Sequence, residues 1–195
     1  FTLPLLGEHN ALNALAAIAA GRHMKLDDEQ IAAGLRRAAP VNMRLASQSV
    51  GEGKAAVTVI NDAYNANPDS MAAALAVLAE APTRNRRVAV LGDMAELGDQ
   101  APRLHRELGQ RLAGLPVDAA ILIGPMSLHV AEALNRADRG GTVMAIPEWA
   151  DDTPEQVAAR IESGDTVLIK ASRSAGLERL LPAIARRFES NPSVK

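Results

Sequence analysis

A cluster of amide, carboxylate and phenol side chains follows the apolar segment at residues 55–60 of this chain. The cluster contains Asp62, Tyr64, Asn65 and Asn67, and it predicts that a helix begins next, with Asn67 as its N-cap. In an open α/β sheet, ligands bind in the crevice beyond the carboxyl ends of the strands, so we expect Asp62 there as a hydrogen-bond acceptor. The alternative is a turn whose Asn and Asp side chains only satisfy their own backbone. The local pattern leaves both interpretations open.

Two further polar clusters are expected at the same edge of the sheet, because each follows an apolar segment. One contains Asp93 and Glu96, which are candidates for acid–base groups or for capping a helix near Pro102. The other contains Lys170 and Arg173, which could bind a carboxylate or a phosphate. Taken alone, this last segment is better explained as a solvated loop that caps the final helix.

A fourth polar cluster lies between a predicted short strand at residues 1–6 and a predicted helix at residues 11–20. It contains His9, Asn10 and Asn13. Asn13 lies one turn beyond the junction, where its carboxamide could offer both a donor and an acceptor to the edge of a purine. The alternative is that Asn10 caps the helix and Asn13 faces solvent.

Composition excludes several classes of protein. The absence of cysteine excludes disulfides, thiolate metal sites and a cysteine nucleophile, and it agrees with a cytoplasmic location. A net charge of −2 and an aromatic content of 2% provide no footprint for nucleic acid. No apolar run approaches the ~20 residues that span a bilayer.

Motif searches exclude several kinds of site within this chain. The sequence contains no phosphate loop, no dinucleotide-binding fingerprint and no hydrolase nucleophile elbow. Its histidines show no metal-ligand spacing, so we expect no metal ligands here. His105 and His129 are expected on helix surfaces.

Strand-like and helix-like segments alternate from residue 45 onward, and this alternation predicts the fold. Near-continuous apolar strands are typical of a parallel sheet that is covered on both faces. We therefore expect an α/β domain with a Rossmann-like, doubly wound, mostly parallel sheet, preceded by a pair of helices. The predicted strands are residues 55–60, 87–91, 119–123, 142–146 and 166–170. The predicted helices are residues 11–20, 28–37, 68–80, 102–112, 127–135, 154–161 and 177–188. Residues 40–45 are predicted to be a linker, residues 51–54 a turn between two strands, and residues 189–195 a frayed tail.

Taken together, four blocks of this sequence resemble the Mur ligases of peptidoglycan synthesis. The blocks are residues 7–17, 61–71, 90–98 and 170–174, with Arg44 between the first two. The resemblance extends over nearly the whole chain. The Asp-Asn-Pro-Arg signature of a related ligase, which adds meso-diaminopimelate, is missing here. This absence favours the branch of the family that adds the dipeptide D-Ala-D-Ala.

The resemblance implies an ATP-dependent amide ligase. In this family ATP activates the carboxylate of UDP-MurNAc-tripeptide as an acyl phosphate, the amine of D-Ala-D-Ala attacks it, and two Mg²⁺ ions offset the accumulated charge. By the same resemblance, Asn13 contacts adenine, Asp62 contacts the ribose, and Arg44 acts catalytically on the ATP phosphates. The residues implied to line the incoming dipeptide and the acceptor are Tyr64, Asn65, Asn67, Ser172 and Arg173.

The resemblance also implies domain boundaries. Residues 1–40 correspond to the helical end of a central ATP-binding domain, and residues 41–195 correspond to the Rossmann-like C-terminal domain. A UDP-sugar domain and the rest of the central domain, with its phosphate loop and Mg²⁺ ligands, are expected upstream. The chain alone is therefore expected not to turn over substrate. Alternatives are another Mur or folylpolyglutamate-type ligase, a non-catalytic α/β module that binds a nucleotide or peptide, and a purely structural domain.

Overall fold

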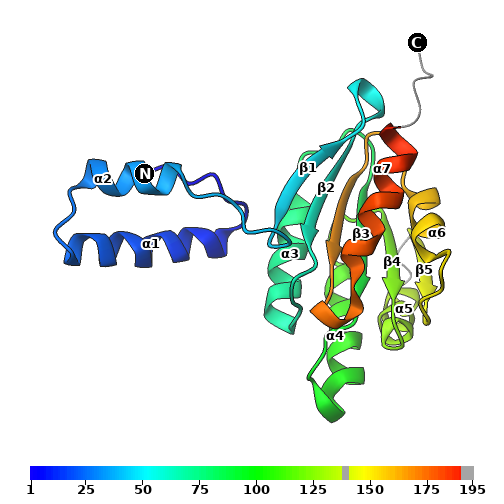
Figure 1. Ribbon diagram of the computed structural model, residues 1–195. Helices are drawn as coiled ribbons and strands as arrows, with labels where there is room; N and C mark the ends of the chain where they lie inside the picture. Colours follow the sequence, from blue (N-terminus) through cyan, green and yellow to red (C-terminus); the bar gives the residue numbers. More distant parts are fainter. Residues whose placement is uncertain (138–140, 190–195) are drawn as a thin grey trace.

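The computed structural model describes residues 1–137 and 141–189, which form a helical hairpin and an α/β body (Figure 1). The hairpin projects from the body and is joined to it by the segment that precedes the first strand. No helix in the described part of the chain is long and apolar enough to cross a membrane. Glu189 ends the last helix, and the rest of the predicted tail lies outside the described residues.

The hairpin consists of α1 (Glu8–His23) and α2 (Asp28–Arg36). Helix α2 begins with the capping box that its sequence predicts. The Asp27 side chain accepts from the backbone N–H of Gln30, and the Gln30 side chain accepts from the backbone N–H of Asp27. This reciprocal pair explains why α2 begins where it does.

Two predictions for the start of the chain are wrong. Residues 1–6 form no strand, since none of the described strands pairs with them. Helix α1 also begins earlier than predicted and continues through Gly21 instead of breaking there. Gly21 lets the two helices pack closely, since a Cβ atom at this position would lie 3.0 Å from the side chain of Ile31.

Within the described residues the α/β body contains a sheet of six strands in the order β1-β2-β6-β3-β4-β5. Strand β1, at the edge, runs antiparallel to β2, and every other neighbouring pair is parallel. The strands are β1 (Ala46–Val50), β2 (Val57–Asp62), β3 (Arg87–Gly92), β4 (Ala119–Ile123), β5 (Thr142–Ile146) and β6 (Thr166–Lys170). The predicted α/β fold with a mostly parallel sheet is confirmed. Strand β1 escaped direct prediction because its central residues are polar and exposed, as suits an edge strand.

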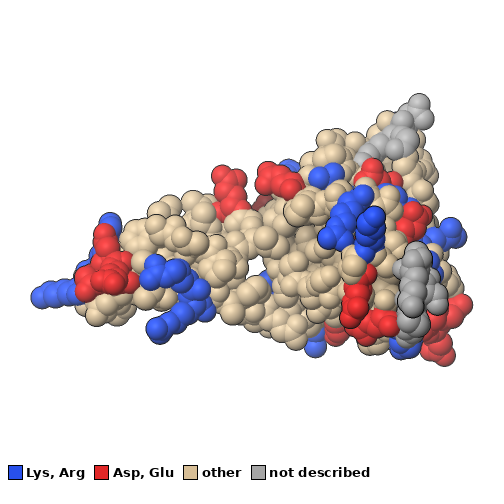
Figure 2. All heavy atoms as spheres, turned by 90° about the horizontal axis from the view of Figure 1, so that it is seen from above, with Lys and Arg blue, Asp and Glu red and all other residues tan. Residues whose placement is uncertain are grey.

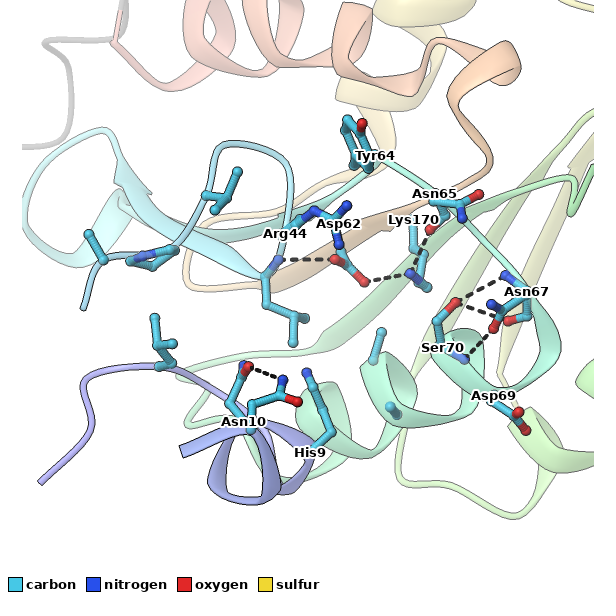
Figure 3. Close-up of a pocket in the computed structure, with 18 residues that line it drawn as sticks. His9, Asn10, Arg44, Asp62, Tyr64, Asn65, Asn67, Asp69, Ser70 and Lys170 are labelled. Atoms are coloured by element: carbon cyan, nitrogen blue, oxygen red, sulfur yellow. Dashed lines mark hydrogen bonds and ion pairs between the residues drawn. The ribbon is translucent and has the colours of Figure 1, made fainter. Parts of the chain in front are cut away.

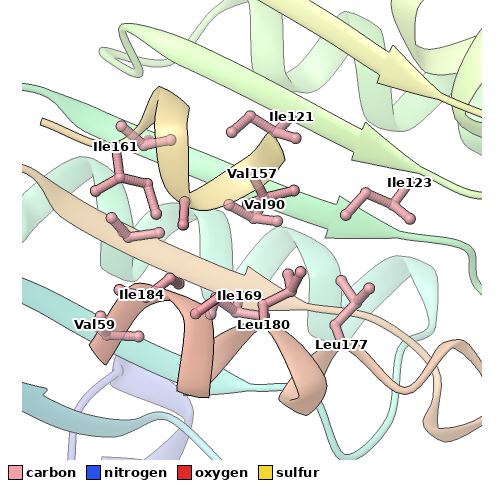
Figure 4. Close-up of a cluster of buried hydrophobic side chains, with 14 of the residues drawn as sticks. Val59, Val90, Ile121, Ile123, Val157, Ile161, Ile169, Leu177, Leu180 and Ile184 are labelled. Atoms are coloured by element: carbon pink, nitrogen blue, oxygen red, sulfur yellow. The ribbon is translucent and has the colours of Figure 1, made fainter. Parts of the chain in front are cut away.

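Helices cover both faces of the sheet, as a doubly wound fold requires. Helices α3, α4 and α5 pack on one face, whereas α6, the short helix η4 and α7 pack on the other, over the apolar cluster in Figure 4. The α-helices are α3 (Pro68–Glu80), α4 (Ala101–Ala113), α5 (Ser127–Arg136), α6 (Thr153–Arg160) and α7 (Leu181–Glu189). The 3₁₀ helices are η1 (Gly53–Ala55), η2 (Gly98–Gln100), η3 (Arg173–Ala175) and η4 (Leu177–Leu180).

Parallel connections bring the carboxyl ends of β2, β6 and β3 to one edge of the sheet. Asp62 of β2 lies opposite Lys170 of β6, and Lys170 lies opposite Leu91 of β3. The linker passes the same edge, because the backbone N–H of Tyr64 donates to the carbonyl of Met43 at 3.1 Å. Three of the polar clusters therefore meet where the sequence predicts.

Candidate functional site

A cavity of about 540 Å³ opens between the start of α1, the linker, the end of β2 and the start of α3 (Figure 3). Seen from above, charged side chains gather at the tip of the hairpin and over the body, and two groups of acidic side chains lie where the hairpin meets the body (Figure 2). The polar residues that line the cavity are His9, Asn10, Asn13, Arg44, Asp62, Tyr64, Asn65, Asn67, Asp69, Ser70 and Lys170. The cavity thus brings together six of the eight predicted site residues.

Asn13 reaches the cavity from α1 with hydrogen-bonding capacity to spare. Its Nδ2 donates to Oδ1 of Asn10 at 3.2 Å, and Nδ2 of Asn10 donates to the carbonyl of Leu6 at 2.7 Å. Asn10 therefore does not cap α1, which begins two residues earlier. Across the described residues, Oδ1 of Asn13 has no hydrogen-bond partner, so it remains available as an acceptor.

The amides in the last residues of β2 and in the turn after it satisfy their own backbone, as the plain-turn interpretation expects. Oδ1 of Asn61 accepts from the N–H of Ala63, and Oδ1 of Asn65 accepts from the N–H of Ala66. Asn67 is the predicted N-cap of α3, and its Oδ1 accepts from the N–H of Ser70 at 2.8 Å. These side chains shape the wall of the cavity by fixing the local turn.

Asp62 behaves differently, because both of its partners are distant in the sequence. Its Oδ1 accepts from the backbone N–H of Leu45 at 3.0 Å, and its Oδ2 accepts from Nζ of Lys170 at 2.6 Å. Nζ of Lys170 also donates to the carbonyl of Asn65 at 2.9 Å. A carboxylate has about four lone-pair sites, so Asp62 can still accept from a hydroxyl in the cavity.

Arg44 is exposed, and its guanidinium lies over the ring of Tyr64, 4.4 Å from the ring centroid. This arrangement is a cation–π contact, which at an exposed site contributes ~0.5–1 kcal/mol. The contact is weak enough for a strongly anionic ligand in the cavity to compete with it. Arg44 therefore supplies a cation at the mouth of the cavity.

Ser172 and Arg173 do not line the cavity. Oγ of Ser172 donates to the carbonyl of Asp93 at 2.7 Å, which joins the loops after β6 and β3. The guanidinium of Arg173 contacts Sδ of Met43 at 3.0 Å and forms an ion pair with Glu178. Both side chains thus support the surroundings of the cavity in this structure.

Asp93 does not cap the predicted helix near Pro102, and its partner is instead the residue that precedes α5. Its carboxylate accepts from the N–H of Met126 at 3.2 Å, and burial raises the pKa of this carboxyl above its usual value. Glu96 of the same loop is exposed. Asp93 therefore has a structural role in this loop.

His105 is buried, so its prediction as a surface residue is wrong. Its Nε2 accepts from the N–H of Met94 at 3.1 Å, and its Nδ1 lies 2.7 Å from the carbonyl of Ala101. These partners require a neutral ring with the proton on Nδ1, and burial lowers the pKa of His105. His129 is half-buried, with its Nδ1 3.2 Å from the guanidinium of Arg106.

Residues 43–173 match the protein family described as Mur ligase, glutamate ligase domain. The chain is 35% identical over 181 residues to the UDP-N-acetylmuramoyl-tripeptide–D-alanyl-D-alanine ligase of Bacillus subtilis, covering 93% of this chain and 39% of that protein. The chain therefore spans about two fifths of the length of such relatives.

Two solved structures are also similar to this chain. MurF from Acinetobacter baumannii superposes with a TM-score of 0.78 at 31% identity, covering 94% of this chain and 39% of that one. MurF from Thermotoga maritima, solved in complex with ADP, superposes with a TM-score of 0.74 at 25% identity, covering 95% of this chain and 40% of that one.

Proposed function

The chain belongs to the Mur ligase family, and from that premise we propose that it is part of an ATP-dependent ligase that joins D-Ala-D-Ala to UDP-MurNAc-tripeptide. One observation carries the proposal: a single cavity gathers Asn13, Arg44 and Asp62 from three separate elements. A carboxamide, a guanidinium and a carboxylate suit the base, the phosphates and the ribose of a nucleotide. The volume of the cavity lies in the range of ~300–1,000 Å³ that is typical of small-ligand sites.

Each residue has a proposed role that its surroundings permit. Asn13 binds adenine through its free Oδ1 and its second N–H group. Asp62 accepts a hydrogen bond from a ribose hydroxyl while it keeps its hydrogen bonds from the Leu45 amide and from Lys170. Arg44 leaves the ring of Tyr64 and binds the phosphates, where it stabilises charge that develops during transfer to the tripeptide carboxylate.

The acceptor side is proposed along the rest of the edge, at Tyr64, Asn65, Asn67, Ser172 and Arg173. Tyr64 and Asn65 line the same cavity as Arg44, and the exposed ring of Tyr64 contacts the Arg44 guanidinium. Ser172 is buried and bonded to the carbonyl of Asp93, so it requires movement before it touches a ligand, whereas the Arg173 side chain is 60% exposed.

Mg²⁺ is proposed to bind through ligands outside this chain. Among residues 1–137 and 141–189, no group of three or more His, Cys, Asp or Glu side chains could hold a metal ion. When bound, Mg²⁺ would offset phosphate charge during transfer.

We further propose the predicted domain boundary, with residues 1–40 as the end of a central ATP-binding domain and residues 41–195 as the C-terminal domain. The family match begins at residue 43, and the helical hairpin stands apart from the sheet (Figure 1). The central and UDP-sugar domains would then complete the site, and a cytoplasmic location would supply ATP.

The test is phosphate release by the longer protein that contains this chain, with ATP and UDP-MurNAc-tripeptide. We expect release with D-Ala-D-Ala and none with single amino acids. Release with a single amino acid would instead assign the chain to a sister ligase. Absence of release with every acceptor would favour a binding module and contradict the proposal.

A further inference from the structure

Lys170 is a buried lysine whose charge is paired with groups inside the protein. Its side chain is 2% exposed, and strand β6 lies between β2 and β3 in the centre of the sheet. Its Nζ donates to Asp62 and to the carbonyl of Asn65, both next to the cavity. A lysine held by two such partners in the protein interior is poorly placed to bind a phosphate itself.

The carboxylate of Asp62 is a bridge between the sheet and the linker. One oxygen accepts from Lys170 and the other accepts from the backbone N–H of Leu45. The Asp62 side chain is 13% exposed, so these two donors replace most of the hydrogen bonds that water would otherwise donate to the carboxylate. Lys170 thereby determines where the acceptor for the Leu45 amide lies.

The linker is anchored on both sides of Arg44. Met43 packs in the core on the α7 face of the sheet, whereas Leu45 packs in the core on the α3 face. Both residues have positive φ values, 64° for Met43 and 49° for Leu45, a backbone conformation that is strained for side chains of this kind. Such strain persists only where surrounding contacts hold it. The Asp62–Leu45 hydrogen bond is one of those contacts, and Arg44 sits between the anchors.

We propose that Lys170 is a positioning residue: by orienting the Asp62 carboxylate onto the Leu45 amide, it holds Arg44 at the mouth of the cavity. The role of Arg44 rests on the proposed function, whereas the bridge from Lys170 to Leu45 does not. Lys170 touches no ligand in this account. It acts through Asp62 and the backbone of the linker.

The first experiment measures hydrogen exchange of single amides by NMR in the 195-residue chain, with no ligand added. In Lys170→Met, the Leu45 amide should exchange at least about tenfold faster, as expected from losing a hydrogen bond to a charged acceptor. The amide of Leu168, in the same strand, should keep its rate. Lys54→Met is the matched control, because Lys54 is exposed, and it should change neither amide. An unchanged Leu45 rate, or an equal rise at Leu45 and Leu168, would overturn the proposal.

Lys170→Met leaves an unpaired charge on Asp62, which could prevent folding, so a second pair of variants includes one in which both charges are removed. Asp62→Asn is compared with Asp62→Asn combined with Lys170→Met. Neither contains the carboxylate, so the difference between them reports the orienting effect of Lys170. Faster exchange at Leu45 in the double variant supports the proposal, and equal rates overturn it.

Kinetics of the longer protein provide a readout that general destabilisation would not move. Lys170→Met should raise KM for ATP at least about tenfold, the effect of losing one well-placed hydrogen-bonding group, and leave KM for D-Ala-D-Ala unchanged. Unchanged values of both kcat and KM for ATP would contradict the positioning role, because a displaced Arg44 should impair transfer to the tripeptide carboxylate. If the wild-type protein shows no ATP-dependent activity, the proposed function fails, and the exchange rates still decide the role of Lys170.

Discussion

At the scale of single residues, the polar stretch that begins at the end of β2 contains two kinds of side chain. Asn61, Asn65 and Asn67 bond to backbone groups within three residues, whereas Asp62 bonds to Leu45 and Lys170. Local satisfaction explains the amides without any ligand. Only the Asp62 carboxylate indicates how the site is assembled, because its hydrogen-bond partners come from other elements.

Arg44 gives the sharpest test of catalysis at this scale. Arg44→Ala should lower kcat of the longer protein by about 10²-fold or more, since it removes a donor that stabilises charge in the transition state. The fold should be intact, because the guanidinium is exposed and contacts the ring of Tyr64. Arg37→Ala is the control, since Arg37 is an exposed arginine that does not line the cavity. A normal kcat in Arg44→Ala would remove Arg44 from the proposed mechanism.

Predictability from sequence differs among these residues for a physical reason. The Asn67 cap was predictable because capping involves residues three apart, and the residue types suffice to define it. The hydrogen bond from Leu45 to Asp62 was not predictable, since its donor is a main-chain group that every non-proline residue has. The pairing of Lys170 with Asp62 required the strand order, which places β6 next to β2.

At the scale of elements, the strands that pair in parallel were predicted best. The predicted bounds of β4, β5 and β6 agree with the structure, and those of β2 and β3 differ by two residues at most. Continuous apolar runs mark such strands directly. The edge strand β1 and the continuity of α1 at Gly21 depend on which element lies alongside, which the local pattern does not contain.

His105 joins two elements, the loop after β3 and helix α4, and its burial makes that joint sensitive to acid. Its pKa is lowered from 6.5 in the folded chain. Between this lowered pKa and about 6.5, the unfolded chain binds a proton that the folded chain does not bind. The free energy of unfolding should therefore fall as the pH drops through this range, and this contribution should vanish above pH 6.5.

Urea unfolding at several pH values tests the role of His105. In His105→Gln the loss of stability on acidification below pH 6.5 should be smaller than in the wild type. Asp93 acts in the opposite direction at lower pH, because its pKa is raised, so the comparison uses the difference between variant and wild type at each pH. His23→Gln, at an exposed position, should retain the wild-type dependence. Identical pH dependence in His105→Gln and wild type would refute the prediction.

At the scale of the whole molecule, the hairpin carries apolar surface that the body leaves uncovered. Leu12 is 66% exposed and Leu15 is 61% exposed, both on α1, the helix that delivers Asn13 to the cavity. Exposed apolar side chains on a site-forming helix are consistent with further protein packing there. The proposed central domain would cover this face and fix Asn13 relative to Arg44 and Asp62.

The 195-residue chain alone should therefore show no ADP release that depends on D-Ala-D-Ala, while the longer protein should show it. Part of a nucleotide site can still hold a ligand. Phosphoryl transfer, however, needs the ATP phosphates fixed in line with the acceptor carboxylate. This sequence contains no phosphate loop that could fix them. The measurement is coupled detection of ADP at matched concentrations of the two proteins, with ATP, UDP-MurNAc-tripeptide and Mg²⁺ present. The same assay on the longer protein with Arg44→Ala sets the background for a folded but impaired site. A rate for the isolated chain above that background would mean that these residues contain the whole catalytic apparatus.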